Sequence, residues 1–149
     1  MNIAIGCDEA AFSMKETVKA YVEKLGHTVK DYGVYNTDPV LYPDIAYAVA
    51  TAVADGKQER GILICGTGIG MAITANKVPG IRAAVCHDAY STERSRKSNN
   101  CQVMTMGARV IGEETAKMMV KIWLDCEFQG GGSAAKVDRI CAIEKEFQK

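Results

Sequence analysis

The sequence predicts an α/β protein in which helices cover both faces of a parallel sheet. Apolar runs that are too short for helices alternate along the chain with longer segments of helical periodicity. One run, residues 62–64, is apolar at every position, as expected of a parallel strand buried on both faces. A glycine-rich turn at residues 66–70 and a helix-forming segment follow it directly, which is the strand–turn–helix order of such folds.

Alternating elements fill the first half of the chain. In order, we predict a strand at 3–7, a helix at 12–25, a strand at 27–32, a helix at 43–54 and the strand at 62–64. In the first helix, Val18, Val22 and Leu25 share one face, and Gly26 is well placed to end it. Pro43 suits the first turn of the second helix, so residues 34–42 remain as a loop.

The second half repeats the same alternation and then adds one helix. The predicted elements are a helix at 71–76, a strand at 81–86, a helix at 89–98, a strand at 102–106, a helix at 112–126 and a last helix at 135–147. The helix at 112–126 is clearly amphipathic, with Met119, Val120 and Trp123 on one face. A glycine-rich break at 128–133 separates the last helix from the rest.

The composition is that of one globular domain spanning residues 1–149. Hydrophobic residues make up 48% and charged residues 24% of the chain. Lys plus Arg and Asp plus Glu both number 18, so net charge gives no reason to expect nucleic acid or an anionic membrane. We find no apolar stretch long enough to span a bilayer and no signal peptide. We therefore expect a cytoplasmic protein without nucleic-acid or membrane partners.

Cysteine and histidine usage argues against a metal site. The six cysteines are scattered without a Cys-x-x-Cys pair, and the chain has only two histidines. We expect reduced thiols, no metal and no cofactor. All cysteines except Cys65 are predicted to be small core residues.

The expected site lies where the parallel strands end. In such sheets, ligands bind beyond the carboxyl ends of the strands. The residues at those ends are Asp8 and Glu9, the turn from Cys65 to Gly70, His87 and Asp88, and residues 107–109. A glycine turn before a helix presents backbone N–H groups that can bind a phosphate or a transient oxyanion.

The glycine turn fits none of the common nucleotide or phosphatase motifs. A Walker A loop needs Gly-Lys-Ser/Thr, but Met71 follows Gly70. The dinucleotide fingerprint needs its third glycine one residue later and a place after the first strand. No arginine closes the loop as a cysteine phosphatase requires. What remains is Cys65 beside backbone donors, acting as nucleophile or general base, with His87 as a partner whose distance the sequence does not give.

Several stretches together resemble the type B ribose-5-phosphate and galactose-6-phosphate isomerases. They are Ile-Gly-Cys-Asp at 5–8, Tyr-Pro-Asp at 42–44, Ile-Cys-Gly-Thr-Gly-Ile-Gly at 64–70, Ala-Asn-Lys-Val-Pro-Gly-Ile-Arg-Ala-Ala at 75–84 and Met-Gly-Ala-Arg-Val-Ile-Gly at 106–112. The resemblance runs in order over nearly the whole chain. It implies a three-layer α/β/α fold with a five-stranded, flavodoxin-like (Rossmann-like) parallel sheet and a C-terminal helix.

The resemblance also implies a metal-free aldose–ketose isomerase that interconverts ribose 5-phosphate and ribulose 5-phosphate, or a close small sugar phosphate. Such enzymes are dimers or dimers of dimers, and their sites are shared between subunits. The implied catalytic residues are Cys65, the base that moves a proton between C1 and C2 through a cis-enediol(ate), and Thr67. The implied binding residues are Gly66, Gly68 and Gly70 for the oxyanion, Asp8 and Asn99 for sugar hydroxyls, and Arg109 for the phosphate.

Four positions depart from the family pattern. Glu9 stands where a histidine usually follows the first aspartate, and Ser98 stands where the family has its ring-opening histidine. Gly132 and Lys136 replace two phosphate-binding arginines, and a lysine offers a point charge without a bidentate fork. We still expect Lys136 to bind the phosphate, and Glu9 and Ser98 to bind the substrate. His87 is a further candidate for substrate contact, with a hydrogen-bonding role beside the site as the alternative.

The departures leave the substrate open. Residues 87–109 are most similar to a branch of tetrulose-4-phosphate isomerases, so interconversion of erythrulose 4-phosphate and erythrose 4-phosphate is an alternative. A tetrose 4-phosphate cannot close a five-membered ring, so it does not require the histidine that Ser98 replaces. A third alternative is a non-catalytic module that binds a sugar phosphate; retention of Cys65 favours an enzyme instead.

Overall fold

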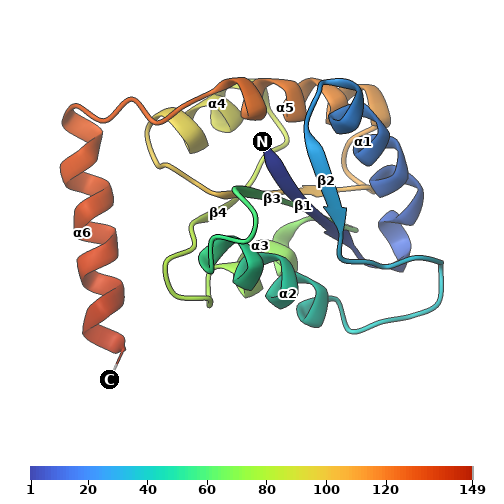
Figure 1. The fold of residues 1–149 in the computed structure, drawn as a ribbon, viewed down its shortest axis with the longest axis horizontal. Coiled ribbons are helices and arrows are strands. Elements are labelled where there is room, and N and C mark those ends of the chain that lie inside the picture. The colour runs from blue at the N-terminus through green and yellow to red at the C-terminus, as the bar shows by residue number, and fades with distance from the viewer. Residues whose placement is uncertain (149) are drawn as a thin grey trace.

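A five-stranded, all-parallel sheet forms the centre of the computed structural model, which describes residues 1–148 (Figure 1). Its strands are β1 (Asn2–Cys7), β2 (Thr28–Asp31), β3 (Arg60–Cys65), β4 (Ala83–Val85) and β5 (Val103–Gly107). The order across the sheet is β2-β1-β3-β5-β4, and every neighbouring pair is parallel. The predicted α/β class with five parallel strands is confirmed.

Helices cover both faces of this sheet. The helical elements are a short 3-10 turn η1 (Glu9–Ala11), α1 (Phe12–Lys24), α2 (Tyr42–Ala54), α3 (Ile69–Ala75), α4 (Ala89–Lys97), α5 (Glu113–Asp125) and α6 (Gly132–Phe147). α1 and α5 pack on one face with α4 beside α5, while α2 and α3 pack on the other. Side chains alternate along each strand. Ile3 and Ile5 therefore pack in the core under α1 and α5, and Ala4 packs in the core under α2 and α3. Within residues 1–148, no helix combines the length and apolar character needed to cross a membrane.

Most predicted boundaries lie within two residues of the observed ones, and the clearest differences have local reasons. β4 pairs only over Ala83–Val85 rather than 81–86, because the backbone N–H of Ile81 closes a turn onto the carbonyl of Val78. α6 starts at Gly132 instead of 135, directly after two glycines at positive φ. η1 was not predicted at all, since a single turn is too short to carry a periodic apolar pattern.

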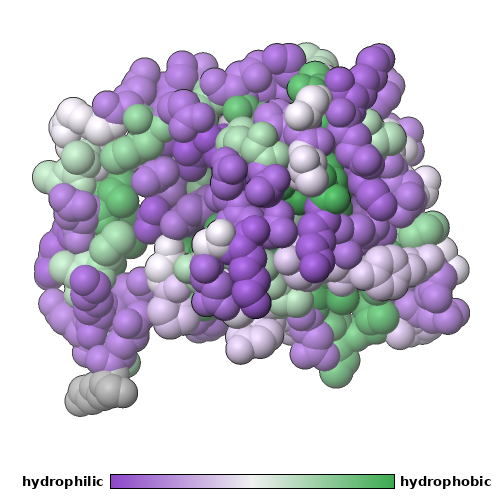
Figure 2. All heavy atoms as spheres, in the orientation of Figure 1, coloured by the Kyte–Doolittle hydropathy of each residue, from purple (hydrophilic) through white to green (hydrophobic). Residues whose placement is uncertain are grey.

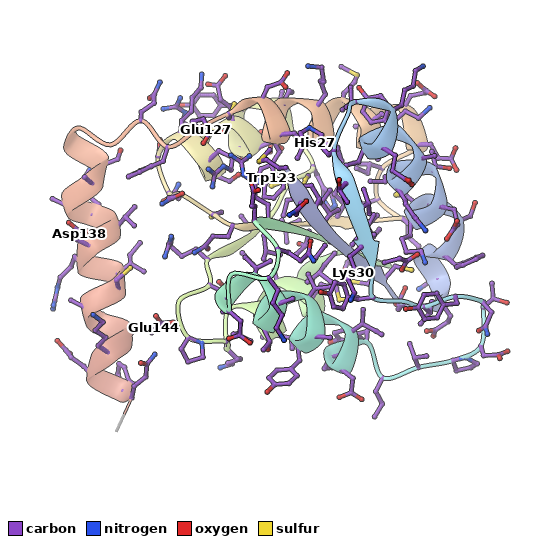
Figure 3. All side chains as sticks on the ribbon, in the orientation of Figure 1. His27, Lys30, Trp123, Glu127, Asp138 and Glu144 are labelled. Carbon is purple, nitrogen blue, oxygen red and sulfur yellow. The ribbon has the colours of Figure 1, made fainter. Side chains whose placement is uncertain are left out.

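The last helix, α6, stands apart from the α/β body (Figure 1). Its only buried residue is Val137, and Ile140, Ile143 and Phe147 are exposed. Apolar side chains gather on this helix in the space-filling view (Figure 2). Glu144 extends towards the body, where its carboxylate accepts the Gly80 N–H at 3.0 Å (Figure 3). A helix with so few contacts to its own body leaves apolar surface available for another molecule.

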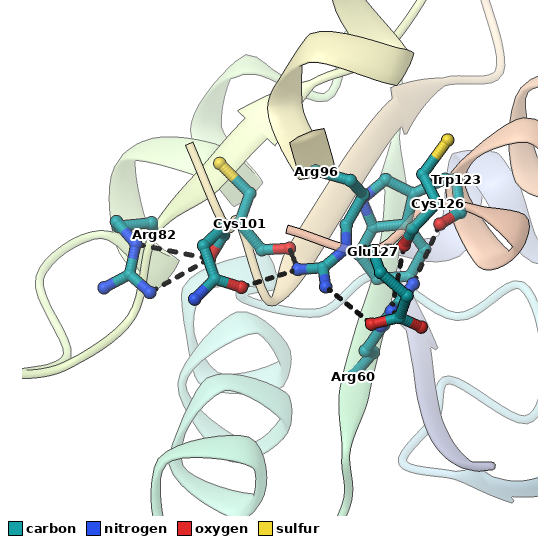
Figure 4. A network of polar contacts seen from close by, with 8 residues as sticks. Arg60, Arg82, Arg96, Cys101, Trp123, Cys126 and Glu127 are labelled. Atoms are coloured by element: carbon teal, nitrogen blue, oxygen red, sulfur yellow. Dashed lines mark hydrogen bonds and ion pairs between the residues drawn. The ribbon is translucent and has the colours of Figure 1, made fainter. Parts of the chain in front are cut away.

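Two buried arginines hold the segment that leads into α6 (Figure 4). Arg60 donates to the carbonyls of Trp123 and Cys126 at 2.8 and 3.1 Å, and Arg96 donates to the Cys126 carbonyl at 3.3 Å. Glu127 pairs with Arg60 at 2.9 Å and with Arg96 at 3.7 Å. Burial lowers the pKa of Arg96 to about 10. The segment from Trp123 to Glu127, which precedes α6, is therefore anchored to the body.

Candidate active site

Cys65 ends β3, between the carboxyl ends of β1 and β5. Its side chain is buried, and its Sγ accepts a hydrogen bond from the Gly68 N–H at 3.1 Å. The neighbouring Thr67 is exposed, and its hydroxyl accepts the Ile69 N–H at 3.2 Å. A sulfur at the mouth of a turn of backbone donors can exchange a proton with a substrate held by those donors.

The glycine turn is pressed against β5, and this contact explains its composition. A Cβ on Gly68 would lie 2.9 Å from the carbonyl carbon of Met106, and Gly68 also has a φ of +81°. The Gly68 carbonyl accepts a hydrogen bond from the Thr105 hydroxyl at 2.8 Å, which fixes the turn to β5. A Cβ on Gly107 would lie 2.6 Å from the Cα of Thr67. Side chains at these glycines would push the turn away from the sheet.

Tyr42 reaches the turn from the first residue of α2, a placement that sequence reasoning missed. A Cβ on Gly70 would lie 2.1 Å from the Tyr42 hydroxyl oxygen, so the phenol occupies the space beside Gly70. In the sequence, Tyr-Pro-Asp at 42–44 carries part of the family resemblance and marks a helix start, but it does not indicate a contact with residue 70. No spacing rule joins residues 42 and 70, because only the packing of α2 on α3 brings them together.

Asp8 and Glu9 lie at the adjacent strand end, as expected for β1. The Asp8 carboxylate accepts the Ala11 N–H at 3.1 Å and so caps η1. Burial, with a further contribution from the charge of Glu9, raises the pKa of Asp8. Glu9 accepts the Val40 N–H at 3.4 Å, which connects η1 to the loop before α2. Both carboxylates thus accept hydrogen bonds from the backbone of their own chain, and both lie at the edge of the site.

His87 and Arg109 approach from the β4 and β5 side. The His87 Nε2 accepts the Gly107 N–H at 2.8 Å, which leaves Nδ1 as the protonated nitrogen of a neutral ring. Burial lowers the pKa of His87, in keeping with a neutral imidazole. The Arg109 guanidinium is exposed and lies over the turn, with Nη1 3.5 Å from the position of a Cβ on Gly66. Arg109 therefore offers a positive charge at the mouth of the turn.

Ser98, Asn99 and Lys136 are not brought to Cys65 within one chain. α4 starts after the carboxyl end of β4 and its 9 residues run back along the sheet, so Ser98 lies about 13 Å further from that end. The Asn99 carbonyl accepts a hydrogen bond from Arg82, just before β4 begins, at 3.0 Å. Lys136 is exposed on α6. Within one chain, Ser98 and Asn99 therefore form a group separate from the residues around Cys65, and Lys136 lies on α6.

The remaining cysteines are mostly core residues, as predicted. Cys7, Cys86, Cys101 and Cys126 are buried, and burial raises the pKa of the Cys7 and Cys101 thiols to about 11. Cys141 is only half-buried on α6, where its sulfur lies 3.6 Å from Nη1 of Arg82. Within residues 1–148, no cluster of three or more His, Cys, Asp or Glu side chains could hold a metal ion.

Comparison with known proteins supplies the family. Residues 3–140 match the Ribose/Galactose Isomerase family. The chain is 58% identical to a D-erythrulose-4-phosphate isomerase of Pectobacterium atrosepticum, covering 98% of this chain and 97% of that protein. It is 51% identical to Ribose-5-P isomerase B of Listeria innocua, covering 98% and 99%.

A solved structure agrees with both relatives. Ribose-5-phosphate isomerase B of Clostridium thermocellum superimposes with a TM-score of 0.97 at 44% identity, covering 99% of this chain and 100% of that one. These similar proteins are named as isomerases, and the chain matches nearly the full length of each. This decides against the alternative of a module that only binds a sugar phosphate. The chain belongs to the ribose/galactose isomerase family and is a sugar-phosphate aldose–ketose isomerase.

Proposed function

We propose that the protein interconverts erythrulose 4-phosphate and erythrose 4-phosphate. The observation that carries this proposal is a serine at position 98, which the family resemblance implies to be the ring-opening position. A pentose 5-phosphate exists mainly as a ring, and opening it needs a group that exchanges protons near neutral pH, as histidine does. A tetrose 4-phosphate carries its phosphate on O4 and stays open. The 58% identical relative named for erythrulose 4-phosphate supports this substrate.

In the proposed reaction, Cys65 is the base. Its thiolate removes the proton from the carbon beside the carbonyl, and the resulting cis-enediolate is reprotonated on the neighbouring carbon. The backbone N–H groups of the turn, together with Thr67, stabilise the oxyanion that forms. Asp8 holds a sugar hydroxyl, and Arg109 contributes positive charge for the phosphate. The carbon-bound proton moves from C1 to C2 while the hydroxyl proton moves from O1 to O2, so the carbonyl group changes place and no oxidant or cofactor is consumed.

Ribose 5-phosphate is the second candidate substrate. Ribose-5-phosphate isomerases B at 51% and 44% identity favour it. In that case another group must open the ring, and His87 or Glu9 are the candidates. His87 already uses Nε2 to accept the Gly107 N–H, which leaves only its Nδ1–H for a substrate.

The two substrates are separated by comparing kcat/KM for erythrulose 4-phosphate and ribose 5-phosphate, in the parent and in Ser98→His. We expect the parent to prefer the tetrulose phosphate. Since general acid–base catalysis contributes about 10²- to 10⁴-fold, Ser98→His should raise activity on the pentose phosphate. A parent that prefers ribose 5-phosphate, together with no gain from Ser98→His, would contradict the open-chain proposal.

We further propose that two copies of the chain share each site, as a homodimer or a dimer of dimers. The two separate groups of candidate residues support this arrangement, with Cys65 from one copy facing Ser98, Asn99 and Lys136 from a second. The exposed Ile140, Ile143 and Phe147 on α6 give the second copy an apolar surface to contact.

Mixing two inactive variants tests the shared site. Cys65→Ala and Asn99→Ala impair different groups, so a mixed dimer would contain one site with both defects and one intact site. After subunits are exchanged, random pairing should restore about a quarter of the parental sites. Activity that stays at the level of the separate variants, or an active species of one chain mass in light scattering, would rule the arrangement out.

A further inference from the structure

An open cavity of about 450 Å³ lies beside the edge strand β4, away from Cys65. It is bounded by β4, by one side of α4 and by Ile140 of α6. Its polar lining consists of the side chains of Asn76, Arg82, Ser91, Arg94, Ser95 and Asn99. Two arginines and no carboxylate line it, so the cavity suits an anion.

Arg94 is the arginine whose hydrogen bonds are incomplete. Its Nη1 donates to the Ser98 hydroxyl at 3.1 Å, and its Nη2 contacts Glu93 at 3.2 Å. Its Nε is buried and has no hydrogen-bond partner anywhere in residues 1–148. A buried donor without a partner is unfavourable, which points to an acceptor that a ligand supplies.

Arg82, by contrast, is occupied with its own chain. Its Nε and Nη2 donate to the Asn100 carbonyl at 3.2 and 2.9 Å, and its Nε also donates to the Asn99 carbonyl. These bonds hold the turn after α4 in place. Arg82 therefore builds the wall of the cavity, while Arg94 keeps donors for a ligand.

A purely structural explanation of Arg94 is incomplete. Arg94, Arg96 and Lys97 all lie in the last turn of α4, where positive charge stabilises the helix dipole. Any one of the three could serve that purpose, and it does not require an unpaired Nε. The contact with Glu93 is between partly exposed side chains, at 33% and 39%, so it is weak and an anion can compete with it.

We propose that Arg94, together with the Ser98 hydroxyl, binds the phosphate group of the substrate. A guanidinium binds a phosphate through two parallel N–H donors, and Nε with one Nη provides such a pair. Because the Ser98 oxygen already accepts from Arg94, its own hydrogen is free to donate to a phosphate oxygen. Arg94 and Ser98 thus form one unit, and the pair is a specificity determinant for the length of the sugar.

This inference rests on the proposed shared site, with Ser98 facing the substrate held at Cys65 of a second copy. In a four-carbon substrate, the phosphate lies one carbon–carbon bond, about 1.5 Å, nearer to the reacting carbons than in a pentose. A phosphate-binding group at Ser98 would then replace a group that lies further from the reacting carbons. The replacement of the family's two phosphate-binding arginines by Gly132 and Lys136 agrees with such a shift.

The test compares Arg94→Gln with Lys97→Gln. Both remove one positive charge from the last turn of α4, and within residues 1–148 the Lys97 ammonium pairs only with Glu93, at 3.5 Å. Binding of inorganic phosphate is measured by titration calorimetry, which does not depend on turnover. We expect Arg94→Gln to weaken phosphate binding by about 10- to 100-fold and Lys97→Gln by less than about 2-fold. Steady-state kinetics with erythrulose 4-phosphate should show a similar loss in kcat/KM, mainly through KM.

Each result bears on the proposal. Equal effects of the two variants would reduce Arg94 to a contribution of net charge, and no effect of Arg94→Gln would remove it from the site. If Arg94→Gln does not fold, Arg94→Lys replaces it; a loss of about 3- to 10-fold in phosphate affinity supports the proposal, and parental affinity overturns it. Specific loss of phosphate binding without turnover of any sugar phosphate would uphold this site while contradicting the proposed substrate.

Discussion

Replacing Cys65 by alanine is expected to lower turnover by about 10³-fold or more without unfolding the protein. The sulfur at the end of β3 is the proposed proton acceptor, and Gly68 N–H is its hydrogen-bond partner at 3.1 Å. Alanine offers no group that can take the proton. Because the side chain removed is small, the change in stability should be limited to about 1–2 kcal/mol. Turnover by coupled assay and thermal unfolding of the same samples measure the two effects.

Cys126→Ala is the matched control for this prediction. Cys126 is also buried, but it lies at the end of α5, where it contributes only its backbone carbonyl to the arginine network. It should lose comparable stability and keep parental turnover. If Cys65→Ala retained near-parental turnover of a good substrate, the base would have to be another group.

Replacing Gly68 by alanine is expected to remove most activity and to destabilise the protein as well. The φ of +81° is unfavourable for alanine by about 1–2 kcal/mol. The added Cβ would also lie 2.9 Å from the Met106 backbone, and overpacking of this kind costs about 1–3 kcal/mol. Moving the turn outwards would displace the N–H donor from Cys65, and a lost oxyanion donor lowers kcat by about 10²- to 10³-fold.

Gly56→Ala separates the two contributions. Gly56 has a similar φ of +77°, but a Cβ there would meet no atom within 4 Å. It should show only the backbone cost in chemical denaturation, with kcat unchanged. Equal losses of kcat in both variants would mean that the effect of Gly68→Ala is general destabilisation rather than displacement of the turn.

The sequence alone was sufficient for the fold class and for the position of one group of candidate site residues. Strand and helix periodicities are local properties, so the alternation along the chain predicted the parallel sheet before any contact was known. The carboxyl-end rule then placed Asp8, the turn from Cys65 to Gly70, His87 and Arg109 at one edge. The structure brings these residues to that edge, because each follows its strand directly and a parallel sheet aligns the strand ends.

Only the tertiary structure decided which residues stay apart and which distant ones meet. Ser98 and Asn99 follow α4, which runs antiparallel to the strands and carries them to the opposite end of the sheet. Tyr42 meets Gly70 because α2 packs on α3, and the unpaired Nε of Arg94 follows from how α4 sits against β4. Such contacts depend on helix direction and packing between segments far apart in the chain, and local sequence patterns carry no information about either.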